Sequence, residues 1–94
     1  MRRKDMMERM TEVASRTGEP LLKQPILELC SNHRVLIEHH KGIGEYSPNT
    51  INVKVKFGSI TISGTNLEVC RMTVEQLVII GTIESITLQK GKGV

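Results

Sequence analysis

The stretch INVKVKFGSITIS, residues 51–63, decides the fold class of this chain. Apolar side chains alternate with polar ones from residue 51 to 57, and apolar and hydroxyl side chains alternate again from 60 to 63. A period of two is typical of strands that bury one face and leave the other in water. Gly58-Ser59 between the two halves predicts a tight reversal. The stretch therefore predicts a β-hairpin.

The same period continues on both sides of this hairpin. It predicts further strands over 26–30, 34–39, 43–46, 67–71, 76–80 and 82–88, with reversals at 31–33, 40–42, 47–49 and 64–66 and at Gly81. Short links force antiparallel neighbours, because a parallel crossover needs a dozen or more residues. We therefore expect a mainly β fold, an antiparallel meander of about eight short strands rolled into a small sandwich or barrel. Residues 77–80 are apolar on both sides, which predicts a central strand covered on each face.

One N-terminal amphipathic helix is expected ahead of the strands. Its apolar stripe has spacings of three and four residues and consists of Met6, Met7, Met10, Val13 and Ala14. Gly18 and Pro20 then give a stop signal. A helix of about three turns is marginal alone, so we expect it to dock on its own domain or on a partner. The predicted organisation is a helix and basic tail over 1–18, a β domain over 19–88 and a flexible basic tail over 89–94.

Length and charge narrow the class of protein. Ninety-four residues suit one domain. The net charge is +3, but residues 19–88 hold six basic and seven acidic side chains, so the basic charge lies at the ends. The longest apolar run has four residues, far short of the ~20 that a bilayer helix needs, so no transmembrane segment is expected. The chain shows no export signal, and Cys30 and Cys70 are therefore expected to stay reduced in the cytoplasm.

The sequence contains residues for two candidate chemical sites, a zinc site and a hydrolytic site. Cys30, His33, His39 and His40 are the residues with zinc-ligand character, but the chain has no Cys-x-x-Cys pair. Cys30 or Cys70 could be combined with His40 and Glu38 as a hydrolytic set, without a nucleophile motif. We expect neither a metal, nor a cofactor, nor catalytic residues. Glu38 and His40 share a strand face, and the predicted hydrogen bond between them would favour protonated His40 and fix the turn before Gly42.

Binding of nucleic acid or another ligand by a small β-barrel is the alternative function. Such domains combine a basic groove with aromatic platforms. Here Lys54 and Lys56 form one short basic stripe, and Tyr46 and Phe57 are the only aromatic residues. A solvated sheet face accounts for this pattern equally well, so nucleic acid is not the expected partner.

Three short motifs, taken in order, resemble the YabP/YqfC family of sporulation proteins. They are IEHHKG at 37–42, ITISG at 60–64 followed by Leu67, and GTI at 81–83. The chain is most similar to the YqfC branch, although it has His39 where that branch has Asn and Ile80 where it often has Glu. The resemblance covers residues 20–88, and each motif is short. The motif residues Glu38, His40, Gly42, Gly64 and Gly81 are the candidates for interaction.

The resemblance implies a small protein without catalytic residues, made in the mother cell during sporulation. We therefore expect a non-enzymatic interaction and assembly module in the cytoplasm of the mother cell or peripherally at the forespore membrane. The expected partner is a protein, such as a membrane-anchored sporulation protein of the YqfD kind. Unpaired sheet edges and the methionine stripe offer surfaces for such a partner or for a homo-oligomer.

Overall fold

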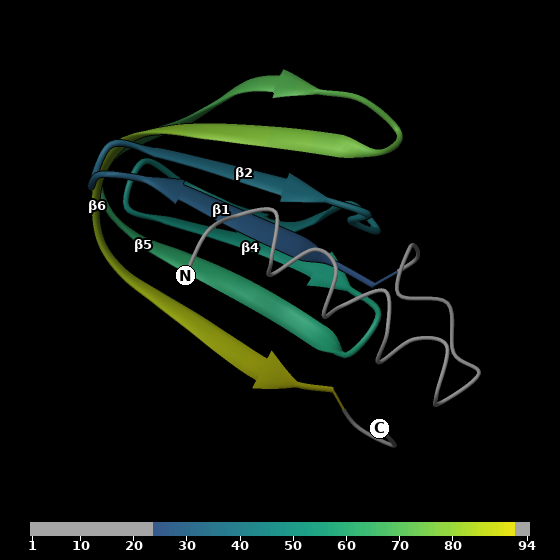
Figure 1. Ribbon diagram of the computed structural model, residues 1–94. Coiled ribbons are helices and arrows are strands. Elements are labelled where there is room, and N and C mark those ends of the chain that lie inside the picture. The colour runs from purple at the N-terminus through teal and green to yellow at the C-terminus, as the bar shows by residue number, and fades with distance from the viewer. Residues whose placement is uncertain (1–23, 92–94) are drawn as a thin grey trace, which may run out of the picture.

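The computed structural model describes residues 24–91 as one antiparallel sheet without a helix (Figure 1). Its six strands are β1 (Ile26–Cys30), β2 (Arg34–Glu38), β3 (Ile43–Tyr46), β4 (Thr50–Val55), β5 (Gly58–Met72) and β6 (Gln76–Lys90). They are arranged in the order β1-β2-β6-β5-β4-β3, so β1 and β3 are the two edges and the sheet is open. The predicted amphipathic helix at 1–18 lies outside the described residues.

The two long strands bend the sheet over on itself, as Figure 1 shows for β5 and β6. The first part of β6 pairs with β2 and with the last part of β5, whereas the last part of β6 pairs with the first part of β5. Three register shifts between Ser63 and Arg71 mark the bend. Bulges increase local twist and bend a strand, which explains why one sheet can enclose a core.

The core lies between the two halves of the bent sheet. Val35 and Ile37 from β2 pack with Leu77 and Ile79 from β6 on one side. Facing them are the inward side chains of β4 and of the first part of β5, namely Ile51, Val53, Val55, Ile60 and Ile62. Complete burial of each such side chain contributes about 1.5–3 kcal/mol, so the alternating pattern seen in the sequence is what holds the halves together.

The expected number of strands is wrong, because two predicted turns are bends within strands. Gly64-Thr65-Asn66 was expected to reverse the chain, yet 60–63 and 67–71 belong to the single strand β5. Gly81 likewise lies inside β6 and joins 76–80 to 82–88. A Cβ atom at Gly64 would overlap the carbonyl oxygen of Thr82, and Gly81 has φ of 139°. Glycine is needed at both places for close approach of two backbones, and not for a hairpin.

The other predicted turns and strand ends agree with the structure in part. The turns predicted at 31–33 and 47–49 are confirmed, since each joins two paired strands. The link at 40–42 instead joins β2 to β3, which are not neighbours in the sheet, so the expected meander of sequential neighbours is wrong at this point. The hairpin predicted at Gly58-Ser59 turns two residues earlier, at Lys56-Phe57, since Val55 pairs with Gly58. Strand β6 also extends beyond residue 88, because Gln89 pairs with Ser59 and Lys90 with Gly58.

Candidate interaction surface

On one half of the bent sheet, the surface that points away from the core carries several apolar side chains. The register places Leu36 on β2 beside Val78 on β6, and Arg34 beside Ile80. Cα partners of neighbouring strands project to the same face, so these four side chains point away from the core. We call this surface the outer face; its lining residues are Arg34, Leu36, Cys70, Arg71, Gln76, Val78 and Ile80.

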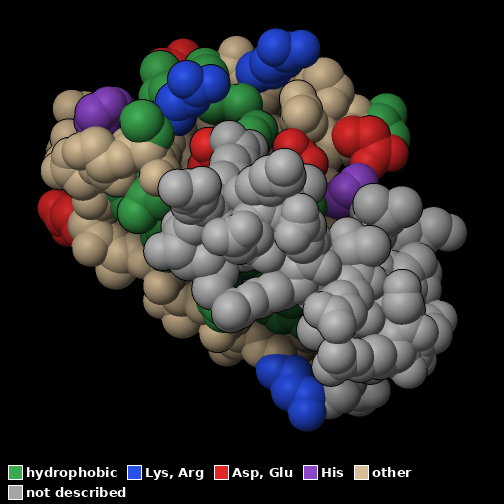
Figure 2. All heavy atoms as spheres, in the orientation of Figure 1, with side chains coloured by type: hydrophobic (Ala, Val, Ile, Leu, Met, Phe, Trp, Pro, Cys, Tyr) green, Lys and Arg blue, Asp and Glu red, His purple; other side chains and the backbone are tan. Residues whose placement is uncertain are grey.

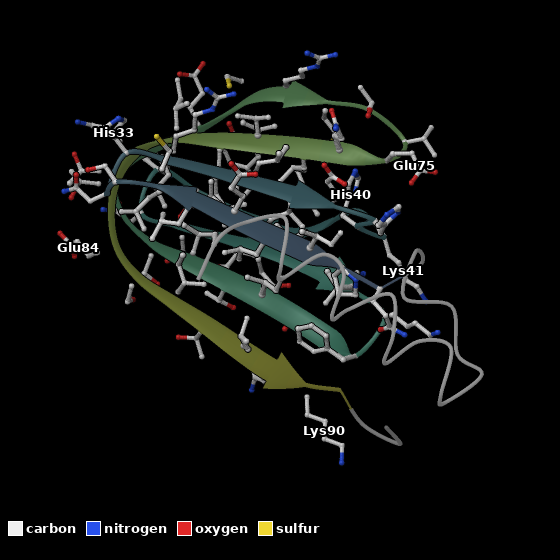
Figure 3. The ribbon with its side chains drawn as sticks, in the orientation of Figure 1. His33, His40, Lys41, Glu75, Glu84 and Lys90 are labelled. Atoms are coloured by element: carbon white, nitrogen blue, oxygen red, sulfur yellow. The ribbon has the colours of Figure 1, made fainter. Side chains whose placement is uncertain are left out.

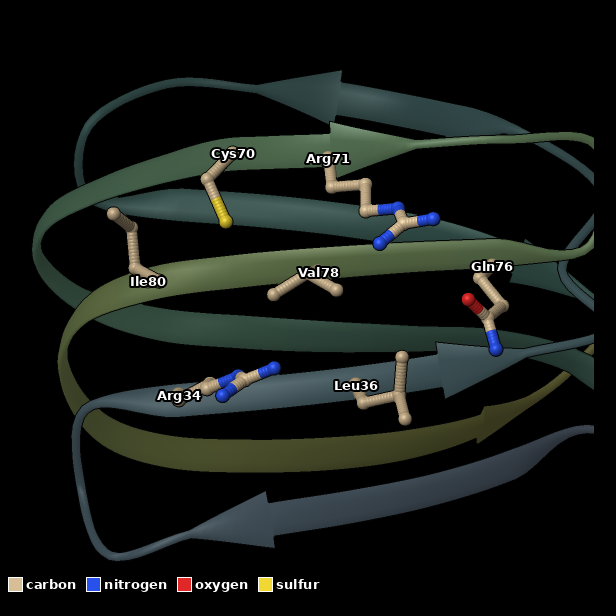
Figure 4. Close-up of a pocket in the computed structure, with 7 residues that line it drawn as sticks. All are labelled: Arg34, Leu36, Cys70, Arg71, Gln76, Val78 and Ile80. Carbon is tan, nitrogen blue, oxygen red and sulfur yellow. The ribbon is translucent and has the colours of Figure 1, made fainter.

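A bulge in β5 completes this surface. The register shifts between Val69 and Arg71, and Cys70 and Arg71 both line the hollow although they are consecutive residues (Figure 4). In a regular strand, consecutive side chains point to opposite faces. The bulge therefore places a thiol and a guanidinium on the same side of the sheet.

The outer face has an apolar floor between two positive charges. Arg34 on β2 and Arg71 on β5 lie on either side of β6, which carries Val78 and Ile80 (Figure 4). Val78 is only 6% exposed, whereas Ile80 is 37% exposed. The aliphatic parts of arginine side chains can cover apolar neighbours while their guanidinium groups stay in water. In Figure 2, hydrophobic side chains lie next to Lys or Arg side chains on the upper part of the molecule.

At the end of β2, the loop to β3 is fastened to the turn between β5 and β6. His39 donates its backbone N–H to the carbonyl of Glu75 at 2.7 Å, and its Nδ1 lies 2.9 Å from Glu75 Oε2. His40 Nε2 lies 2.8 Å from the carbonyl oxygen of Thr73. The Gly42 N–H donates to His40 Nδ1 at 3.0 Å. In this arrangement Nδ1 of His40 accepts from Gly42, and Nε2 faces the carbonyl of Thr73 as a donor.

The predicted bond between Glu38 and His40 is replaced by other bonds. Both ring nitrogens of His40 contact backbone groups, and Glu38 Oε1 accepts a weak bond from Gln76 Nε2 at 3.5 Å. The expected hydrogen bond between Glu38 and His40 is therefore wrong. Its predicted effect on the turn before Gly42 does occur, through the Gly42 N–H.

The five motif residues form two separate groups. Glu38, His40 and Gly42 lie at the β2 end that contacts the β5–β6 turn. Gly64 and Gly81 lie at the bend of β5 and β6, where each closely approaches the opposite strand. The structure does not bring the two groups together into one site. Arg34, Leu36 and Arg71 belong to no sequence motif, although alternation along 34–38 places Arg34 and Leu36 on one face.

The residues considered for metal binding or hydrolysis are also spread out. Cys30 and His33 lie at one end of β2, and His39 and His40 lie at the other, as Figure 3 shows for His33 and His40. Within residues 24–91 no three His, Cys, Asp or Glu side chains are placed to hold a metal ion. Cys30 and Cys70 are both exposed thiols. Cys70 contributes to the outer face, whose lining contains no histidine.

The two aromatic residues serve the fold. Tyr46 Oη accepts the backbone N–H of Val69 at 3.0 Å, which covers part of the free edge of β5. The carbonyl of Pro48 accepts the N–H of Leu67 at 2.8 Å on the same edge. Phe57 is partly buried against the core. Tyr46 thus contributes its hydroxyl to the fold, although the residue is 52% exposed.

None of residues 24–91 forms a helix with the length and hydrophobicity to cross a bilayer.

Comparison with known proteins identifies the family. Residues 23–94 match the model of the YabP family, and the chain therefore belongs to that family. Membership implies a sporulation-related protein, and these sporulation proteins are not known as enzymes. No curated protein and no solved structure matched the chain.

Proposed function

We propose that this member of the YabP family is a non-enzymatic interaction and assembly module, acting in the mother cell or at the forespore envelope. The observation that carries the proposal is the outer face. Its apolar floor of Leu36, Val78 and Ile80 lies between Arg34 and Arg71 in the hollow that these residues line. Apolar centres with arginine beside them are typical of protein-binding surfaces, whereas small ligands are held in deeper clefts.

The proposed partner is a membrane-anchored sporulation protein of the YqfD kind, which would hold the module peripherally at the forespore membrane. We expect the tagged full chain to retain such a protein when it is purified from detergent-solubilised membranes of sporulating cells. Ile80→Asp places a charge on the apolar floor and should reduce the retained amount at least ten-fold, about 1.4 kcal/mol.

The matched control is Val74→Asp, which places the same charge on a side chain that is 88% exposed and does not line the outer face. Retention should remain unchanged in this variant. Equal retention by the wild type and Ile80→Asp, with both proteins folded, would contradict the role of the outer face.

A further inference from the structure

We propose that two copies of this chain associate through their outer faces, about a two-fold axis that runs parallel to the strands between β2 and β6. The inference rests on the proposed function, because it makes a second copy the first partner of the assembly module. It follows from the strand register, which fixes where each outward side chain lies.

Four strands lie side by side on this face, in the order β1, β2, β6 and β5. The register arranges their outward side chains in three rows. The first row holds Cys30, Arg34, Ile80 and Glu68; the second holds Glu28, Leu36, Val78 and Arg71; the third holds Ile26, Glu38 and Gln76. At the centres of the rows, Arg34 lies beside the apolar Ile80, Leu36 beside Val78, and the Glu38 carboxylate beside the Gln76 amide.

A two-fold axis along the strands makes these rows complementary to themselves. Rotation about this axis places β2 of one copy over β6 of the other, and β1 over β5. Each row of one copy then lies over the same row of the other. Leu36 of one copy then faces Val78 of the other, which joins the two apolar floors. Glu38 faces Gln76 of the second copy, so an acceptor meets an amide donor. Every such contact occurs twice, as an isologous interface requires.

The same operation brings opposite charges together. Arg34 of one copy lies over Ile80 of the other, and Glu68 of that copy lies one strand further out. Facing sheets are about 10 Å apart and neighbouring strands about 4.8 Å apart, a distance that extended arginine and glutamate side chains can bridge. A two-fold axis across the strands would instead stack Arg71 of one copy on Arg71 of the other, and like charges disfavour that arrangement.

The first test is sedimentation velocity of the full chain over a series of concentrations. The face is small, so we expect a reversible dimer with a Kd of about 10–100 µM. Arg34→Glu or Glu68→Arg alone should weaken the dimer at least ten-fold, because each sets like charges opposite each other. The double variant exchanges the charges and should restore the wild-type Kd within about three-fold.

The control is Glu45→Arg, a charge reversal on the exposed strand β3 in the other half of the sheet, which should leave the Kd unchanged. A wild-type chain that stays monomeric throughout, or a double variant as weak as the single ones, would overturn the proposal. Far-UV circular dichroism of each variant separates loss of association from loss of folding.

The two thiols give an independent test of the axis. Within one chain, Cys30 and Cys70 lie on strands that are three strand spacings apart, about 14 Å. Across the proposed axis, Cys70 of one copy approaches Cys30 of the other. A bismaleimide that spans about 8 Å should therefore link residue 30 to residue 70 between copies, and Cys30→Ser or Cys70→Ser should each abolish the linked dimer.

Peptide mapping distinguishes the outcomes. A link between residues 30 and 70 of different copies supports the axis, and a link between two copies of Cys70 overturns it. The failure of this inference is distinguishable from the failure of the proposed function. A monomeric chain that still loses its membrane partner on Ile80→Asp would overturn the self-association alone.

Discussion

The side chain of His40 joins two backbone segments, the β2–β3 loop and the β5–β6 turn. Its Nδ1 accepts from Gly42, and its Nε2 lies against the carbonyl of Thr73 in the turn that precedes β6. Beside it, His39 has a φ of 62°, a conformation that non-glycine residues rarely adopt. Side-chain bonds to both turns therefore compensate for an unfavourable local backbone.

Replacing His40 in two steps should separate its two bonds. His40→Asn keeps an acceptor near the position of Nδ1 and loses the contact with Thr73, whereas His40→Ala loses both. We expect losses of about 1 and 2 kcal/mol in the free energy of unfolding. These correspond to decreases in Tm of about 4–8 °C per kcal/mol for a domain of this size. His33→Ala, at the exposed β1–β2 turn, should leave the Tm within about 2 °C.

The sequence was sufficient to predict that His40 stabilises its turn, but the predicted partner, Glu38, is wrong. Glu38 is two residues away and on the same expected face, so proximity in the chain favoured it. The actual acceptor, the carbonyl of Thr73, is 33 residues away, and the turn that brings it near depends on the pairing of β5 with β6. A local pattern carries no information on that contact.

At the scale of the element, Gly64 determines how β5 bends. A Cβ atom there would overlap the carbonyl oxygen of Thr82 across the sheet. Backbone atoms of a paired strand cannot move aside without breaking the ladder. Gly44 provides a contrast, because a Cβ atom there would approach only Oδ1 of the Asn52 side chain, at 2.5 Å.

Gly64→Ala should therefore lower the free energy of unfolding by about 3 kcal/mol, and Gly44→Ala by about 1 kcal/mol or less. Urea denaturation followed by circular dichroism measures both values. Equal losses in the two variants would show that the close approach at the bend does not limit the stability of β5.

The strands themselves were predictable, and the bends were not. Alternation of apolar and polar residues located all the extended segments between residues 26 and 88. Glycine, threonine and asparagine at 64–66 have the composition of a turn, yet the chain continues in the same strand with Asn66 at φ of 55°. Turns and bulges both require residues that tolerate positive φ, so composition cannot distinguish them.

At the scale of the molecule, one core serves both halves of the sheet. Ile37 on β2 and Ile51 on β4 are completely buried in the same cluster, although their strands lie in different halves. The halves should therefore unfold together, as small single domains usually do.

Ile37→Val tests this cooperativity without unfolding the protein. The lost methyl group should lower the free energy of unfolding by about 1 kcal/mol. The slowest-exchanging amides of β4 should lose protection by the same factor as those of β2, about five-fold. Val74→Ala, at a side chain that is 88% exposed, should change neither set. Loss of protection confined to β1, β2 and β6 would show that the halves open separately.

The outer face could not be predicted from the sequence for a related reason. The residues that line it come from β2, β5 and β6, and their proximity depends on which strands are neighbours. The apolar run 77–80 was expected to be covered on both faces. Leu77, Val78 and Ile79 are buried as expected, whereas Ile80 is 37% exposed, so that end of the run is available for contact. The family, by contrast, was predictable, since its short motifs lie in the correct order along the chain.

The pairing of β2 with β6 also affects how the chain folds during translation. Ile37 on β2 lies opposite Leu77 on β6. The β1–β2 hairpin therefore cannot form this pairing until the ribosome has synthesised β6. At about 5–20 residues per second, the ribosome needs about 2–8 s to supply it. During that interval the nascent hairpin exposes Val35 and Ile37 to water, which makes it a natural substrate for chaperones that bind emerging apolar segments.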